Sequence, residues 1–137
     1  MSRATRLMTG LTLILVPTIQ VGGSFLLAAL IDRESGYMTN PLRQNFFRAG
    51  HAHAGVLTIL SLVCQLLVDG ARLSTALQWL VRIGAPLAGI LISAGFFFSV
   101  LAPTATEPSR AIGLIYAGAG LLAVSVVSLG VGLLRAR

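Results

Sequence analysis

Long uncharged apolar stretches dominate the chain, and charged residues lie only between or beside them. Four such stretches cover about residues 7–31, 49–68, 79–102 and 111–134. Each supplies about the 20 apolar residues that a helix needs to cross the roughly 30 Å hydrocarbon layer. None alternates polar and apolar residues with a period of two, so helices are expected rather than a barrel. The pattern predicts an all-α polytopic membrane protein, with residues 1–137 forming a single transmembrane domain of four helices in an antiparallel bundle.

The composition agrees with a lipid environment. Of the 137 residues, 55% are hydrophobic and 10% are charged, and the mean hydropathy is +0.88, whereas soluble domains carry roughly 25% charged residues. The net charge of +6 comes from arginines scattered between the apolar runs. Because they form no basic stripe with interleaved aromatic residues, anionic lipid head groups are the expected partners and nucleic acid is not. The single cysteine, Cys64, excludes an intrachain disulfide.

The distribution of arginines predicts the orientation of the spans. The first apolar run is too long for a signal peptide, so we expect it to remain as a span. With four spans, both termini and the second loop lie on one side of the membrane. That side carries six arginines and one acidic residue, whereas the other side carries four arginines and three acidic residues. By the positive-inside rule, both termini are expected in the cytoplasm, with the chain in a bacterial inner membrane. On that side Asp69 has Arg72 three residues later as a surface partner.

Small residues at four-residue spacing indicate where the spans approach one another. The third span contains a row of Ala85, Gly89 and Ser93, with Gly84 and Ala88 as a second row. The fourth begins with Gly113 and Ala117, with Gly118 and further glycines around them. Small side chains allow the close backbone approach that drives helix association in lipid. We expect these rows to pack the third span on the fourth, and docking to another molecule is the alternative.

Few polar residues within the spans are candidates for chemistry. Gln20 follows Pro17, and we expect its amide to bond the backbone carbonyl that a proline leaves without a donor. Gln65 lies near enough to the membrane surface to reach water. The spans contain no carboxylate, and the chain has no Walker loop, GxSxG or HExxH motif. An enzyme is therefore not expected.

The segment between residues 48 and 55 contains the only two histidines, His51 and His53. Neutral imidazole is a common ligand of haem iron and transition metals, and it also suits a proton relay. Residues two apart on a helix project about 200° apart, so the pair cannot readily bind one ion together. Three interpretations stay open: interfacial histidines that bond head groups, water or helix carbonyls; ligands of haem or a metal; and a sensor of pH.

The His51-Ala52-His53 pair at the outer end of an apolar helix resembles the histidine-bearing helix of haem-copper oxidase subunit I and its relatives. In that family, two histidines two residues apart face different redox centres. The resemblance covers only the short segment around the pair, and it implies His51 and His53 as haem or copper ligands. Because the chain has no further histidine, such a site would need a second copy or a partner chain.

A four-span bundle with short loops is similar, in general type, to small accessory subunits of envelope assemblies such as lipid transporters or respiratory complexes. The leading hypothesis is a non-enzymatic accessory subunit without a cofactor, which stabilises or positions a larger complex and contacts other membrane subunits or a second copy. The alternative is a haem- or copper-binding electron carrier or sensor that uses the two histidines. A third hypothesis, a carrier of lipid or a small hydrophobic molecule, predicts a lateral opening near Phe96 to Phe98.

Overall fold

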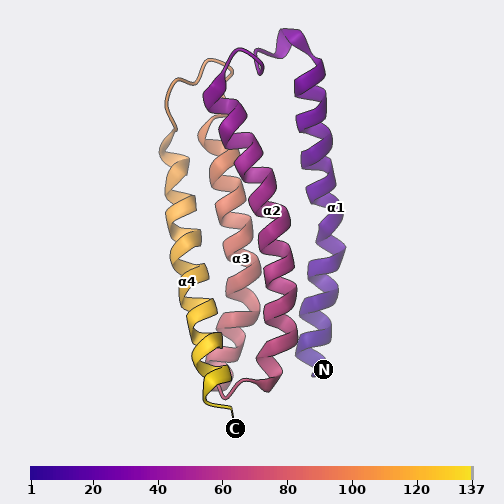
Figure 1. Cartoon of the computed structure of the whole chain (residues 1–137), viewed down its shortest axis with the longest axis vertical. Helices are drawn as coiled ribbons and strands as arrows, with labels where there is room; N and C mark the ends of the chain where they lie inside the picture. The colour runs from indigo at the N-terminus through magenta and orange to yellow at the C-terminus, as the bar shows by residue number, and fades with distance from the viewer. Residues whose placement is uncertain (137) are drawn as a thin grey trace.

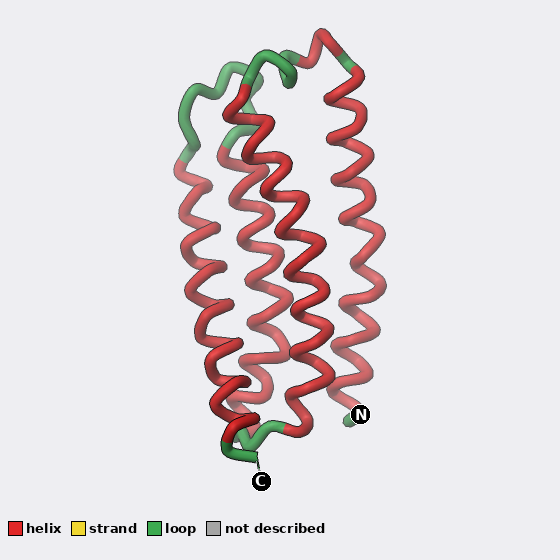
Figure 2. The backbone as a smooth tube through the Cα atoms, viewed as in Figure 1, coloured by secondary structure: helices red, strands yellow, loops and turns green. Residues whose placement is uncertain are grey.

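The computed structural model describes residues 1–136, and four long helices account for most of them (Figures 1 and 2). The long helices are α1 (Arg3–Ile31), α2 (Pro41–Leu67), α3 (Thr75–Ser99) and α4 (Gly113–Leu134). Three single-turn 3-10 helices lie in the connections: η1 (Arg33–Ser35), η2 (Val68–Gly70) and η3 (Arg110–Ile112). Both termini and the α2–α3 connection share one end of the bundle, which we call the terminal end. The α1–α2 and α3–α4 connections form the opposite end, the loop end.

All four helices are long and apolar enough to cross a membrane, so the chain is an integral membrane protein. They pack side by side in an up-and-down bundle, and the prediction of an all-α, four-span architecture is confirmed (Figure 1). The helices differ in how much of their apolar stretch is covered by protein. The buried share is 44% for α3 and 6% for α1, which places α3 in the centre and α1 at the edge.

The second helix begins eight residues earlier than the apolar pattern indicates. The Asn40 side chain accepts a hydrogen bond from the backbone N–H of Arg43, and Pro41 occupies the first turn, where a missing donor has no cost. Residues 42–48 are therefore the first turns of α2. Helix α3 ends at Ser99, three residues before the Ala102 that the apolar pattern indicates.

Helices α3 and α4 approach each other through glycines. A Cβ placed at Gly118 of α4 would lie 2.7 Å from Cγ1 of Ile92 and 3.0 Å from the carbonyl oxygen of Ala88, both in α3. A Cβ at Gly95 of α3 would lie 2.8 Å from the backbone nitrogen of Ile115 in α4. Two backbones this close leave no room for side chains, as in other small-residue contacts in membranes.

The expected packing of the third span on the fourth is found, and the second row of Gly84 and Ala88 makes it, against Ser125 and Gly118 of α4. The residues of the first row lie elsewhere. Ala85 is buried in a cluster that includes Cys64 of α2 and Leu129 of α4, and a Cβ at Gly89 would lie 3.2 Å from Cβ of Leu57 in α2. Gly113 and Ala117 are exposed, and nothing lies within 4 Å of a Cβ at Gly113. Each residue turns a helix by about 100°, so a row shifted by one position faces a different neighbour. Gly89 of the predicted row therefore packs on α2.

Candidate functional site

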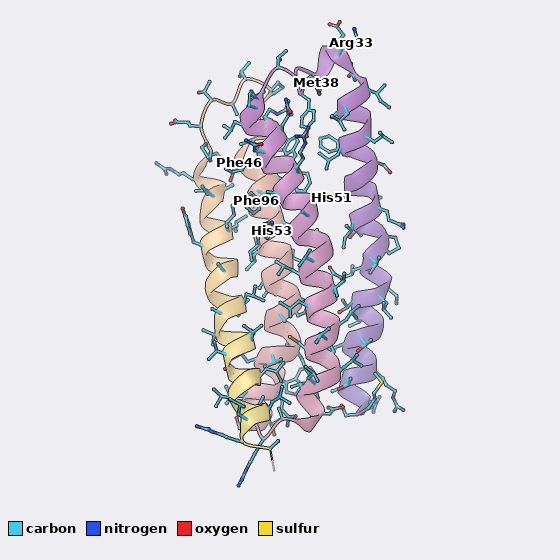
Figure 3. The ribbon with its side chains drawn as sticks, viewed as in Figure 1. Arg33, Met38, Phe46, His51, His53 and Phe96 are labelled. Carbon is cyan, nitrogen blue, oxygen red and sulfur yellow. The ribbon has the colours of Figure 1, made fainter. Side chains whose placement is uncertain are left out.

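The two histidines leave α2 on different sides (Figure 3). His51 points toward α1, where a Cβ at Gly23 would lie 3.2 Å from Cε1 and 3.3 Å from Nε2 of its ring. Glycine therefore allows this imidazole to lie directly against the α1 backbone. His53 is exposed, and its ring stacks on Phe96 of α3 with the centroids 5.0 Å apart. Its Nδ1–H donates to the Ala49 carbonyl oxygen over 2.7 Å.

This arrangement agrees with the expected splay of residues two apart on a helix. One imidazole faces α1 and the other stacks on α3, so the pair does not fit a single haem or copper ion. Among residues 1–136, no three histidine, cysteine, aspartate or glutamate side chains gather at one point.

A cavity of about 360 Å³ lies between α1, α2 and α3, and His51 forms part of its wall. Leu15 of α1 and Ile90 of α3 also line it and are about half exposed, so the cavity reaches the surface that faces lipid. No arginine, aspartate or glutamate is among the lining residues that the structure describes. The polar side chains of the wall belong to Thr12, Thr18, His51, Thr58, Ser61 and Ser93.

These polar side chains differ in whether they are already hydrogen-bonded. Three hydroxyls donate to carbonyl oxygens about one turn earlier on their own helices, at 2.7–2.8 Å; they belong to Thr12, Thr18 and Ser61. The Ser93 hydroxyl oxygen is enclosed and has no partner within residues 1–136. His51 and Thr58 likewise make no side-chain hydrogen bond in this part of the chain. The sequence singled out Ser93 for helix packing, but the structure places it in the cavity wall.

The three consecutive phenylalanines, Phe96 to Phe98, contribute one ring to the cavity wall. Phe97 lines it, Phe96 stacks on His53, and Phe98 is 53% exposed. The opening toward lipid lies at the half-exposed rim residues of α1 and α3 rather than along the whole triplet.

Four polar residues at the terminal end, which we call the terminal polar cluster, attach α1 to the neighbouring helices. The Arg82 guanidinium of α3 is 3% exposed and lies 2.6 Å from a carboxylate oxygen of Asp69 in η2. The other carboxylate oxygen accepts the Thr5 hydroxyl at 2.9 Å and the Ser2 backbone N–H at 2.7 Å. Arg82 also donates to the Thr5 hydroxyl oxygen at 3.0 Å. The first turn of α1 is thus tied to η2, which directly follows α2, and to α3.

Two sequence-based expectations about this end are wrong. Asp69 pairs with Arg82 rather than Arg72, which is exposed and donates its backbone N–H to the Gly132 carbonyl oxygen. Gln65 does not reach water: it is fully buried, and its amide donates to the Arg82 carbonyl oxygen at 2.7 Å. One sequence signal indicated the true pairing. An arginine two turns inside an apolar helix needs a buried partner, and Asp69 is the acidic residue on that side.

Aromatic rings attach α1 at the loop end, in a group that we call the loop-end aromatic cluster. Phe25 of α1 meets Phe47 of α2 edge-on with ring centroids 5.5 Å apart. Phe47 stacks on Phe97 of α3 at 5.3 Å and on Tyr37 at 6.0 Å, and the Arg43 guanidinium lies 5.1 Å from its centroid. Such pairs contribute about 0.5–1.5 kcal/mol each beyond their buried area. Helix α1 is thus held at both ends, and the cavity lies between.

Gln20 lies on the exposed side of α1, and its amide makes no hydrogen bond within residues 1–136. The expected bond to a carbonyl near Pro17 is therefore not found. Ser24, one turn later, is also exposed and without a side-chain hydrogen bond. At 1.5 Å per residue, Gln20 is about 18 Å along the helix from Asp32 and about 21 Å from Arg6. Two polar side chains thus face the middle of the hydrocarbon layer without a partner in the described chain.

No protein family, curated protein or solved structure matches this chain. The function is therefore inferred from the chain's own geometry.

Proposed function

We propose that the protein is a non-enzymatic subunit of a larger membrane complex, to which it binds through the face of α1 that carries Gln20 and Ser24. The observation that carries this proposal is the unpaired Gln20 amide in the middle of the span. A polar group in hydrocarbon costs free energy until it is hydrogen-bonded. Glutamine and serine side chains commonly meet this need by bonding across transmembrane helices. The partner is a transmembrane helix of another subunit with a hydrogen-bonding side chain at the same depth.

The surroundings of Gln20 support a helix contact. Leu13 and Ile31 lie on the same face of α1 and are 52% and 72% exposed, so apolar packing can flank the polar pair. Gln20 projects about 140° around the helix from Leu15, which lines the cavity. The docking face and the cavity wall are therefore different sides of α1.

The contribution of Gln20 to partner binding is measured by the amount of partner subunit that is purified together with the chain. Affinity purification of the tagged full chain from native membranes is followed by quantitative mass spectrometry. Interhelical hydrogen bonds contribute about 0.6–2 kcal/mol, so Gln20→Leu should lower the yield of the partner about three- to thirtyfold. Val21→Leu, at the adjacent exposed position, is the control and should keep the yield. Equal recovery with both variants, or a lone monomer from the unaltered protein, would contradict the proposal.

We further propose that the complex lies in a bacterial inner membrane with both termini of this chain in the cytoplasm. The excess of arginines at the terminal end supports this orientation. In a Cys64→Ala background, a membrane-impermeant maleimide should label Thr106→Cys at the loop end in intact spheroplasts. Thr75→Cys at the terminal end should react only after permeabilisation. The reverse pattern would contradict the orientation.

A haem- or copper-binding carrier is a second candidate, and one observation favours it. Because Nδ1–H of His53 donates to a backbone carbonyl, Nε2 is left as the free ligand atom on an exposed ring, as in many metal-binding histidines. The remaining ligands would come from the neighbouring subunit. The intact complex should then show a haem or copper absorption band that is lost in His53→Gln. A colourless, metal-free complex from haem- and copper-replete cells would contradict this candidate.

A further inference from the structure

We propose that the cavity between α1, α2 and α3 binds a neutral, membrane-soluble molecule whose carbonyl oxygens accept hydrogen bonds, a compound of the quinone type. Ligand sites in helix bundles are mostly apolar, hold a few placed polar groups and begin at about 300 Å³. This cavity has about 360 Å³ and fits that description at the small end, which suits a single-ring head group. The inference does not depend on the proposed docking of α1, because the two surfaces are on different sides of that helix.

The charge of the cavity wall limits the ligand. None of the lining residues that the structure describes is an arginine, aspartate or glutamate, so a cationic group would enter without a counter-ion and an anionic group would meet no permanently charged side chain. Such burial is too costly without pairing. A charged phospholipid head group is therefore excluded from the cavity, and a neutral head group is favoured. Leu15 and Ile90 at the rim give such a molecule a path from the bilayer.

The unpaired polar groups point to an oxygen-bearing ligand rather than a plain hydrocarbon. His51, Thr58 and Ser93 can each donate, and none of them has a hydrogen-bond partner within residues 1–136. An acyl chain would leave these donors unpaired in a medium without water, which costs free energy. Carbonyl oxygens on a ring accept such bonds and carry no charge. The chemistry of the wall thus matches a neutral carbonyl compound.

Glycines set the shape of the cavity. Gly22 lines it, and a Cβ there would lie 3.5 Å from Nδ1 of His51. Gly23 brings the other side of the same ring against α1. Because packing fixes this imidazole in the wall, the donor is in place before a ligand binds, which lowers the entropic cost of binding.

The direct test is nuclear magnetic resonance of the full chain in bicelles with isotope-labelled histidine. Decylubiquinone is the probe, and decylbenzene, which has a similar ring and tail but no oxygen, is its control. We expect saturable shifts of the His51 ring nitrogens with decylubiquinone, smaller shifts with decylbenzene, and no change at His53. Equal responses to both compounds, no response at His51, or equal shifts at both histidines would overturn the proposal.

Variants of the cavity wall measure how much each expected hydrogen bond contributes to the affinity for decylubiquinone. Loss of one hydrogen bond weakens binding about fivefold, so His51→Leu should raise the Kd for decylubiquinone by that factor. His53→Leu, on the other side of α2, should leave the Kd unchanged. Thr58→Val keeps the side-chain volume and should raise the Kd even if His51→Leu folds poorly. Unchanged affinity in both cavity variants would overturn the proposal, while recovery of the partner through Gln20 would be unaffected.

Discussion

Helices α4 and α1 flank the same central pair of helices, yet they contact it in opposite ways. Helix α4 approaches α3 so closely that Gly118 and Gly95 leave no room for a Cβ. Helix α1 is held at its two ends and leaves a cavity of about 360 Å³ in between. Helix α1 also carries an unpaired polar face toward lipid. The first contact is suited to stability, and the second leaves surface for a ligand and a partner.

The largest expected effect is at the α3–α4 contact. A side chain at Gly118 would collide with the α3 backbone, so Gly118→Val should lower the free energy of unfolding by about 3 kcal/mol. The measurement is equilibrium unfolding in mixed micelles. Gly120→Val on the same helix is the control, because a Cβ there meets nothing within 4 Å. Equal losses in both variants would show that α4 does not pack on α3 through Gly118.

Loss of the Arg82 side chain from the terminal polar cluster should lower the free energy of unfolding by less, and the loosening should be confined to α1. Arg82→Met leaves the Asp69 carboxylate without its cation; because Asp69 is 29% exposed, we expect a loss of about 2 kcal/mol, below the usual range for buried pairs. Hydrogen exchange should increase in the first turns of α1 and stay unchanged in α4. Arg72→Gln is the matched control and should change neither region. Faster exchange in α4 with an unchanged α1 would contradict the assigned role.

The smallest effect is expected on the cavity side of α1. Gly22→Ala adds a methyl group 3.5 Å from the His51 ring, an ordinary contact, and alanine favours the helix. The free energy of unfolding should change by no more than about 1 kcal/mol, toward greater stability. The same unfolding assay measures it. A loss as large as that of Gly118→Val would mean that α1 packs as closely as α4, and the contrast between the two helices would be wrong.

The architecture could be predicted from the sequence because four apolar stretches of membrane length have few alternatives. The splay of His51 and His53 also followed from helical geometry alone. Which neighbour each face meets did not follow, since one residue step turns a helix by about 100°. Gly89 therefore packs on α2 rather than α4. The position of an arginine inside the third span indicated a buried partner, but the choice of Arg82 over Arg72 for Asp69 depends on how the turn after α2 places residues 13 positions apart.

The most direct test of the proposed function is photocrosslinking in native membranes from benzoylphenylalanine incorporated at Leu13, which lies on the same face of α1 as Gln20 and leaves the Gln20 amide in place. The same group at Val127, an exposed residue of α4, is the control. We expect position 13 to yield an adduct with a different membrane protein, while position 127 yields adducts with lipid. Only lipid adducts at position 13, or only an adduct of twice the mass of the chain, would contradict a role as a subunit of a larger complex.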